Sequence, residues 1–285
     1  MMKTKQYIVI GSVVVLMGIL LSLDIKGLVK QEDASEVQEG NTATATSGAA
    51  VSSVSQESIS AAAKQNINVS LAAEIEKLEK ELKGASDDEA VALQKQLAQK
   101  WEDVNQPLPA AFAYEAIATK QPALENWLKA GDKFTEGYQN YSDTTAIPGL
   151  IEKAKNAYSK ALELNKESLE AQTGLGVAYV SEGKSPMQGI QMLLAVVQKD
   201  PKNLSANLNL GLFSMKSGQF NKAVDRFKTV IAVDPKPEAY FYLATSYENL
   251  GMKKEAIAAY EKSKALAADP GLTNFVDRKI KELSN

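Results

Sequence analysis

Apolar and small residues recur along the second half of the chain with a period of about 34 residues. The clearest copy of this pattern contains Leu210-Gly211, Ala223, Phe227 and Pro235. Copies displaced 33 residues forwards and 35 residues backwards contain Leu243-Ala244, Ala256, Tyr260, Leu175-Gly176 and Pro201. Because a unit of this length is too small to bury its own apolar face, the period predicts supersecondary units that stack on one another.

This pattern resembles the tetratricopeptide repeat (TPR), in which Leu-Gly and Tyr in one helix precede Ala, Phe and Pro in the next. The resemblance implies an all-α, right-handed solenoid of about five antiparallel helix pairs, a C-terminal capping helix and a concave groove. It also implies that small residues lie where helices cross closely and that aromatic residues fill the gaps between units. The matching positions are Gly131, Gly176, Gly211, Ala223, Phe227, Pro235, Ala256 and Tyr260.

The register of the pattern divides residues 86–285 into repeat units and a cap. The predicted units are 91–123, 124–168, 169–203, 204–236 and 237–270, followed by a cap helix at 272–284. The second unit has 11 extra residues between Gly131 and Ala154, which predicts a longer first helix and a loop near Ser142–Pro148. In the fourth unit, Ser214 replaces the usual aromatic residue of the first helix.

A different apolar pattern opens the chain. Tyr7–Leu23 contains 17 residues without a charge and follows a short tail, residues 1–6, that carries Lys3 and Lys5. This length is at the short end for a membrane-spanning helix, and no small-residue cleavage site follows, so an uncleaved signal anchor is expected rather than a cleaved signal peptide. The basic tail favours a single-pass protein of the bacterial inner membrane whose body faces the periplasm. A cytoplasmic-facing body is the alternative.

Two further segments separate this anchor from the repeats. Residues 24–66 are poor in apolar residues, which predicts a disordered linker. In the predicted helix 67–84, Leu71, Ile75, Leu78 and Leu82 recur at spacings typical of an apolar helix face. Two readings remain open for this helix: it packs against the first repeat, or residues 70–83 form a coiled coil that makes a homodimer.

Composition narrows the possible functions. The chain has no Cys and no His, which excludes thiol catalysis, disulfides and Cys-ligated zinc and removes the commonest general base. Asp and Glu, 35 in all, outnumber the 32 Lys and Arg residues, and an acidic body is a poor candidate for nucleic-acid binding. We therefore expect no cofactor, no metal and no nucleic-acid partner.

The resemblance also implies a binding surface on the first helix of each unit. Carried over to this sequence, the predicted groove residues are Val177, Val180, Leu208, Leu212, Met215, Phe241 and Glu248. The centre of the predicted groove is apolar, and its acidic residues are Asp132 and Glu136 in unit two together with Glu238 and Glu248. A carboxylate clamp of the co-chaperone type is not indicated, because Thr173 and Val177 stand where Lys and Asn are needed.

The sequence therefore predicts a non-enzymatic scaffold or adaptor that binds another protein or peptide in the groove at the membrane surface. The alternatives are a cytoplasmic-facing adaptor or co-chaperone and, from a different class, an enzyme that uses Asp or Glu with Tyr. The enzyme is disfavoured because no carboxylate pair converges on a buried site.

Overall fold

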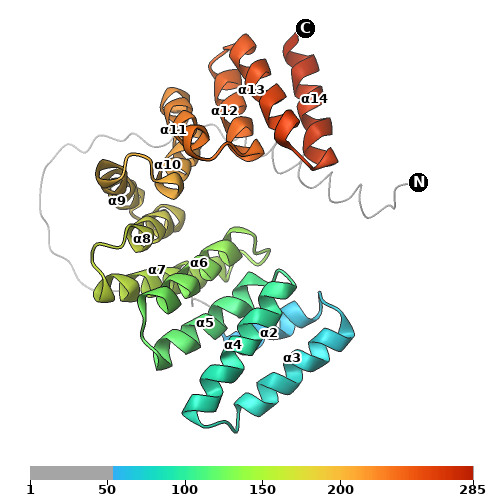
Figure 1. Cartoon of the computed structure of the whole chain (residues 1–285), viewed down its shortest axis with the longest axis vertical. Coiled ribbons are helices and arrows are strands. Elements are labelled where there is room, and N and C mark those ends of the chain that lie inside the picture. Colours follow the sequence, from blue (N-terminus) through green and yellow to red (C-terminus); the bar gives the residue numbers. More distant parts are fainter. Residues whose placement is uncertain (1–53, 285) are drawn as a thin grey trace, which may run out of the picture. The chain divides into compact units, whose positions relative to one another are not determined.

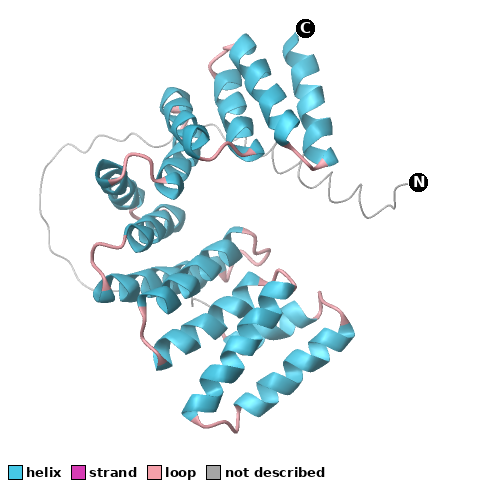
Figure 2. Ribbon diagram, in the orientation of Figure 1, coloured by secondary structure: helices cyan, strands magenta, loops and turns pink. Residues whose placement is uncertain are grey.

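The computed structural model describes residues 54–284, and this part of the chain forms thirteen helices and no strand (Figures 1 and 2). The helices are α2 (Gln56–Lys64), α3 (Val69–Leu82), α4 (Asp87–Asp103), α5 (Pro107–Lys120), α6 (Leu124–Gln139), α7 (Ile147–Leu164), α8 (Leu169–Glu182), α9 (Pro186–Lys199), α10 (Leu204–Lys216), α11 (Phe220–Val233), α12 (Pro237–Asn249), α13 (Lys253–Leu266) and α14 (Pro270–Ser284). The prediction of an all-α chain is confirmed for these residues.

The helices pack in order along the chain (Figure 1). Successive pairs are α4–α5, α6–α7, α8–α9, α10–α11 and α12–α13, and α14 packs against α13. The first helices of neighbouring pairs also touch, because α6 contacts α8, α8 contacts α10, and α10 contacts α12. The first helices from α6 to α12 therefore share one face, and this face holds the candidate site.

Short sequence signals set the ends of the helices. The Ser168 side chain accepts a hydrogen bond from the backbone nitrogen of Ala171 at 3.2 Å, which caps α8. Asn203 caps α10 in the same way, through the backbone nitrogen of Ala206 at 3.0 Å. These caps satisfy N–H groups that have no partner inside the helix. Gly183 then ends α8 at a φ of 77°, a left-handed conformation that glycine adopts without steric cost.

Glycines at the helix crossings set how closely paired helices approach. A Cβ atom added at Gly211 would lie 2.6 Å from the Phe227 ring, so α10 and α11 meet where one residue is small and the other is large. Between α8 and α9 the approach is closer still. A Cβ atom at Gly189 would overlap the carbonyl oxygen of Gly176 and lie 2.9 Å from the backbone nitrogen of Val180.

Aromatic side chains from the second helices fill the space between units. Tyr158, Phe227 and Tyr260 are at most 2% exposed, and Ala223 and Ala256 are fully buried. The positions that the sequence pattern marks as structural lie in these contacts, apart from Pro235. That proline follows α11 and lies in the turn that leads to α12.

Two helices precede the first repeat pair. The residues of α2 fall inside the segment predicted as a disordered linker, and the structure corrects that prediction over Gln56–Lys64. Here Ile59 and Ala63 are buried, Ile59 in the cluster that contains Leu108 and Phe112, so this short stretch has apolar contacts that offset the cost of ordering it.

The next helix, α3, packs against α4. Its Ile75 side chain is fully buried and belongs to the same apolar cluster as Leu97 and Trp101. This contact agrees with one of the two alternatives for the predicted helix 67–84, in which the apolar face of the helix packs against the first repeat.

The membrane placement expected from the sequence requires correction. From Val54 to Ser284, no helix is both long enough and apolar enough to cross a membrane. The physical reason is visible in α7, the longest of these helices. Charged side chains are spread along its 18 residues, at Glu152, Lys153, Lys155, Lys160 and Glu163. This finding overturns the single-pass placement in the bacterial inner membrane with a periplasmic body. The segment Tyr7–Leu23 itself lies outside the described residues.

Candidate binding groove

A cavity of about 650 Å³ lies on the shared face of the first helices. Its walls come mainly from α6, α8 and α10, with Tyr158 reaching in from α7. The other lining residues are Asp132, Thr135, Glu136, Gln139, Glu170, Thr173, Gly174, Val177, Asn203, Leu204, Ser205, Leu208, Asn209 and Leu212. This size is within the range of cavities that hold a small molecule or a few residues of a peptide.

The wall formed by α10 is apolar. Leu204, Leu208 and Leu212 follow one another at intervals of four residues, so they lie along one side of the helix. Leu204 is 36% exposed, whereas Leu208 and Leu212 are partly buried against the C-terminal apolar cluster. Asn209 adds a polar group beside them, although its side-chain nitrogen already donates to the Ser205 carbonyl at 2.9 Å.

The opposite wall is acidic. The Tyr158 hydroxyl donates a hydrogen bond to Asp132 Oδ1 at 2.8 Å. Loss of surrounding water raises the pKa of the Asp132 carboxyl above its ordinary value, and the Tyr158 hydrogen bond acts in the opposite direction. Glu136 is paired with Lys133 at 3.0 Å, but among residues 54–284 neither Asp132 nor Glu170 has a cationic partner. This wall therefore favours a positively charged group.

One buried polar atom also faces this cavity. Thr173, on α8, is 3% exposed, and its Oγ1 atom has no hydrogen-bond partner within the described part of the chain. An unpaired buried hydroxyl costs about 1–3 kcal/mol, so a bound group that pairs with it gains specificity. Thr173 thus gives the groove a polar contact between its apolar and acidic walls.

The predicted groove residues divide into two groups. Val177, Leu208 and Leu212 line the cavity, although Val177 is only 5% exposed. The other four, Val180, Met215, Phe241 and Glu248, do not line it.

Two of these four have structural contacts instead. The Phe241 ring packs 5.7 Å from the rings of both Tyr260 and Phe275, measured between centroids. Glu248 accepts a hydrogen bond from Tyr260 at 2.7 Å and forms an ion pair with Lys279 of α14 at 2.9 Å. These two residues therefore join α12 to the helices that follow it.

Three lining residues, Glu170, Leu204 and Tyr158, were not predicted from the sequence. Glu170 and Leu204 lie in the first turns of α8 and α10, and their positions within the repeat unit could have predicted that they line the groove. Tyr158 belongs to a second helix, but the space left by Gly131 and Gly174 allows its ring to reach through to the groove.

Asp132 and Tyr158 form a hydrogen-bonded carboxylate–tyrosine pair in the groove, which is the residue combination that the enzyme alternative requires. Burial and the nearby Asp132 carboxylate raise the pKa of the Tyr158 phenol well above its ordinary value. A phenol of this kind keeps its proton near neutral pH and cannot act as a general base.

Comparison with known proteins gives a family match within the repeat region. Residues 214–272 match a family model described as tetratricopeptide repeat. The peroxisomal targeting signal receptor of Kluyveromyces lactis is 26% identical over a match that covers 55% of this chain and 32% of the receptor. Anaphase-promoting complex subunit 3 of Dictyostelium discoideum is 28% identical, with 44% of this chain and 13% of the subunit covered. The chain thus spans about a third or less of the length of these relatives.

A solved structure gives the same fold. A thermophilic TPR protein of Thermus thermophilus is 20% identical, with a TM-score of 0.52, and the match covers 68% of this chain and 98% of that one. At this identity the likeness concerns the fold alone.

Proposed function

We propose that this protein, whose repeats are of the tetratricopeptide type, is a non-enzymatic scaffold that binds an extended segment of a partner protein in the groove between α6, α8 and α10. The observation that carries the proposal is the cavity with an apolar wall on α10, an acidic wall on α6 and α8, and an unpaired Thr173 hydroxyl. A segment that fits these groups has an aliphatic side chain followed by Lys or Arg.

The relatives support a role in protein interaction. The name of the Kluyveromyces lactis relative makes that protein a receptor for a targeting signal, and the Dictyostelium discoideum relative is a subunit of a complex. Only the general role is carried over to this chain, because it spans a small part of each. The chemistry of the segment comes from the groove itself.

A charge reversal in the groove tests the proposal. Peptides are first selected on the full chain from a random displayed library, and their affinities are measured by calorimetry. We expect the selected peptides to contain Lys or Arg and to bind the Glu170→Lys variant about tenfold more weakly, which corresponds to about 1.4 kcal/mol.

The control is Glu255→Lys, which makes the same change of charge at an exposed position of α13 outside the groove. This variant is expected to bind the peptides as the unaltered protein does. Equal loss of binding in the two variants would indicate a general charge effect, and unchanged binding by Glu170→Lys would place the peptide site elsewhere.

A further inference from the structure

The fourth unit differs from its neighbours at one packing position. In the third and fifth units this position holds Tyr179 and Tyr247. The Lys155 ammonium of α7 lies 5.0 Å from the centre of the Tyr179 ring, and the Lys228 ammonium of α11 lies 5.7 Å from that of Tyr247. At both junctions, an aromatic ring thus packs beneath a lysine of the preceding second helix.

In the fourth unit the same position holds Ser214, and the large residue has moved to the neighbouring position. Phe213 stands where the third and fifth units have Ala178 and Ser246, both fully buried. This exchange places a large ring at a position that is small in the neighbouring units. Of the junctions between adjacent units, this one is the least closely packed.

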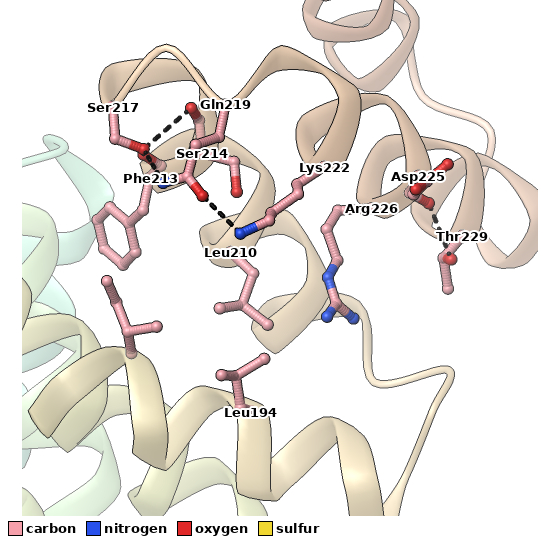
Figure 3. Close-up of a pocket in the computed structure, with 11 residues that line it drawn as sticks. Leu194, Leu210, Phe213, Ser214, Ser217, Gln219, Lys222, Asp225, Arg226 and Thr229 are labelled. Carbon is pink, nitrogen blue, oxygen red and sulfur yellow. Dashed lines mark hydrogen bonds between the residues drawn. The ribbon is translucent and has the colours of Figure 1, made fainter. Parts of the chain in front are cut away.

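The second helix at this junction has changed as well. When α9 is aligned on its buried Leu193, which matches Tyr158 and Phe227, its residues equivalent to Lys155 and Lys228 are Ile190 and Leu194. Both the ring and the lysines are therefore absent from this junction. What is left is a cavity of about 260 Å³, lined by Ile190, Leu194, Leu210, Phe213 and polar residues of α11 (Figure 3).

The surface beside this cavity is apolar and accessible. Met187 is 62% exposed and Leu194 is 42% exposed, and no charged residue lies between Pro186 and Gln198. A helix that is apolar on its outer face as well as its inner face is typical of a helix with a partner on both sides.

The remaining wall of the cavity carries two cations, Lys222 and Arg226, and one carboxylate, Asp225. Lys222 donates to Gln219 Oε1 at 2.6 Å, and Arg226 donates to Asn207 Oδ1 at 3.0 Å. Neither cation pairs with a carboxylate among the described residues. Figure 3 shows both side chains lying over the cavity, whereas Asp225 lies further along α11 near Thr229.

We propose that this α9–α11 cavity is a second binding site, which takes an aromatic side chain of a partner protein that has an Asp or Glu next to it. The ring occupies the place that Tyr179 and Tyr247 occupy at the neighbouring junctions, against Ile190 and Leu194. The adjacent carboxylate pairs with Lys222 or Arg226. This site is separate from the groove, because no residue lines both.

The test fills the cavity from inside the protein. Ser214→Tyr restores the residue of the neighbouring units and should close the site. A random displayed peptide library is selected on the full chain and then depleted on the Ser214→Tyr variant, which removes peptides that bind the groove. We expect the remaining peptides to carry an aromatic residue beside Asp or Glu and to bind Ser214→Tyr at least about tenfold more weakly.

Two further variants complete the experiment. Leu194→Glu places a negative charge at an exposed apolar position of α9, so it repels the carboxylate of the same peptides and should weaken their binding without lowering the melting temperature. Gln99→Tyr adds the same ring on α4 and should leave their binding unchanged. The proposal is overturned if depletion removes every peptide, or if the remaining peptides lack the aromatic and acidic pair. It is also overturned if sedimentation shows that Ser214→Tyr abolishes a self-association of the unaltered protein, because the occupant would then be a second copy.

Discussion

In two of the helix pairs, a glycine of one helix faces a large side chain of the other. Gly211 leaves room for Phe227, and Gly131 leaves room for Tyr158. In the pair α8–α9, both partners are small and the two backbones meet directly at Gly176 and Gly189. Each crossing is thus specified by side-chain volume, and an added carbon atom must be accommodated by movement of a helix.

The Gly211 crossing gives a prediction for stability. Gly211→Leu forces α10 away from the Phe227 ring, and we expect it to lower the free energy of unfolding by about 1–3 kcal/mol or more. The control is Gly84→Leu, because a Cβ atom at Gly84 has nothing within 4 Å. Chemical denaturation measures the free energy of unfolding of both variants. A stability of the Gly211 variant equal to that of the Gly84 variant would show that the two helices do not meet at this residue.

The buried tyrosines predict a loss of stability at high pH. The phenol pKa values of Tyr158 and Tyr260 lie above the ordinary value of 10.0, mainly because burial disfavours the charged form. Between the unfolded and the folded pKa, the folded state binds more protons, so the free energy of unfolding falls as the pH rises above 10.

Replacing either tyrosine removes part of this effect. Tyr260→Phe is expected to lose less stability than the unaltered protein between neutral pH and about pH 11, as measured by denaturation at each pH. Its stability at neutral pH will be lower, because the hydrogen bond to Glu248 is lost. If both proteins show the same pH dependence, Tyr260 ionises freely in the folded state.

Among the elements, α2 had the least informative sequence. This segment is rich in Ser and Ala, which is also the composition of a linker, and its helix depends on the burial of Ile59 and Ala63. By contrast, α3 has a regular apolar face, and the sequence predicted both the helix and its contact with the first repeat as one of two readings.

The α3–α4 contact can be tested at Ile75. Ile75→Ala removes a fully buried side chain and should lower the free energy of unfolding by about 2–5 kcal/mol. Val69→Ala, at a position of the same helix that is 85% exposed, should change it little. The stability loss must not depend on protein concentration. A concentration-dependent loss would favour the coiled-coil dimer, in which Ile75 contacts a second copy.

How much could be predicted depended on how far neighbouring units repeat one another. The last three units were predicted with their helix order, because Leu-Gly, Ala and an aromatic residue recur there at nearly constant spacing.

The groove was predicted only in part. Val177, Leu208 and Leu212 follow from the register, but whether Phe241 faces solvent depends on Phe275 in α14, which no repeat position specifies. Likewise, the missing aromatic residue at Ser214 was visible in the sequence, but the cavity beside it was not.

For the chain as a whole, residues 54–284 are stabilised by contacts between helices that are close neighbours in the sequence. The same order divides the surface into regions with different chemistry. The groove has an acidic wall next to an apolar one, whereas the α9–α11 cavity combines an apolar floor with two cations. A scaffold with these two sites could hold two partner segments of opposite charge on neighbouring units.

The loosely packed junction between α9 and α10 also affects how the repeats unfold. In a linear array, the folding of each unit depends on its neighbours through their shared interface, so cooperativity is transmitted least well across the weakest interface. Here the weakest interface is the one between α9 and α10, which separates the units up to α9 from the units that begin with α10. Strain or local opening on one side is therefore poorly transmitted to the other. A side chain bound in the cavity would add contacts to both helices, and part of its binding free energy would then couple the two halves of the array.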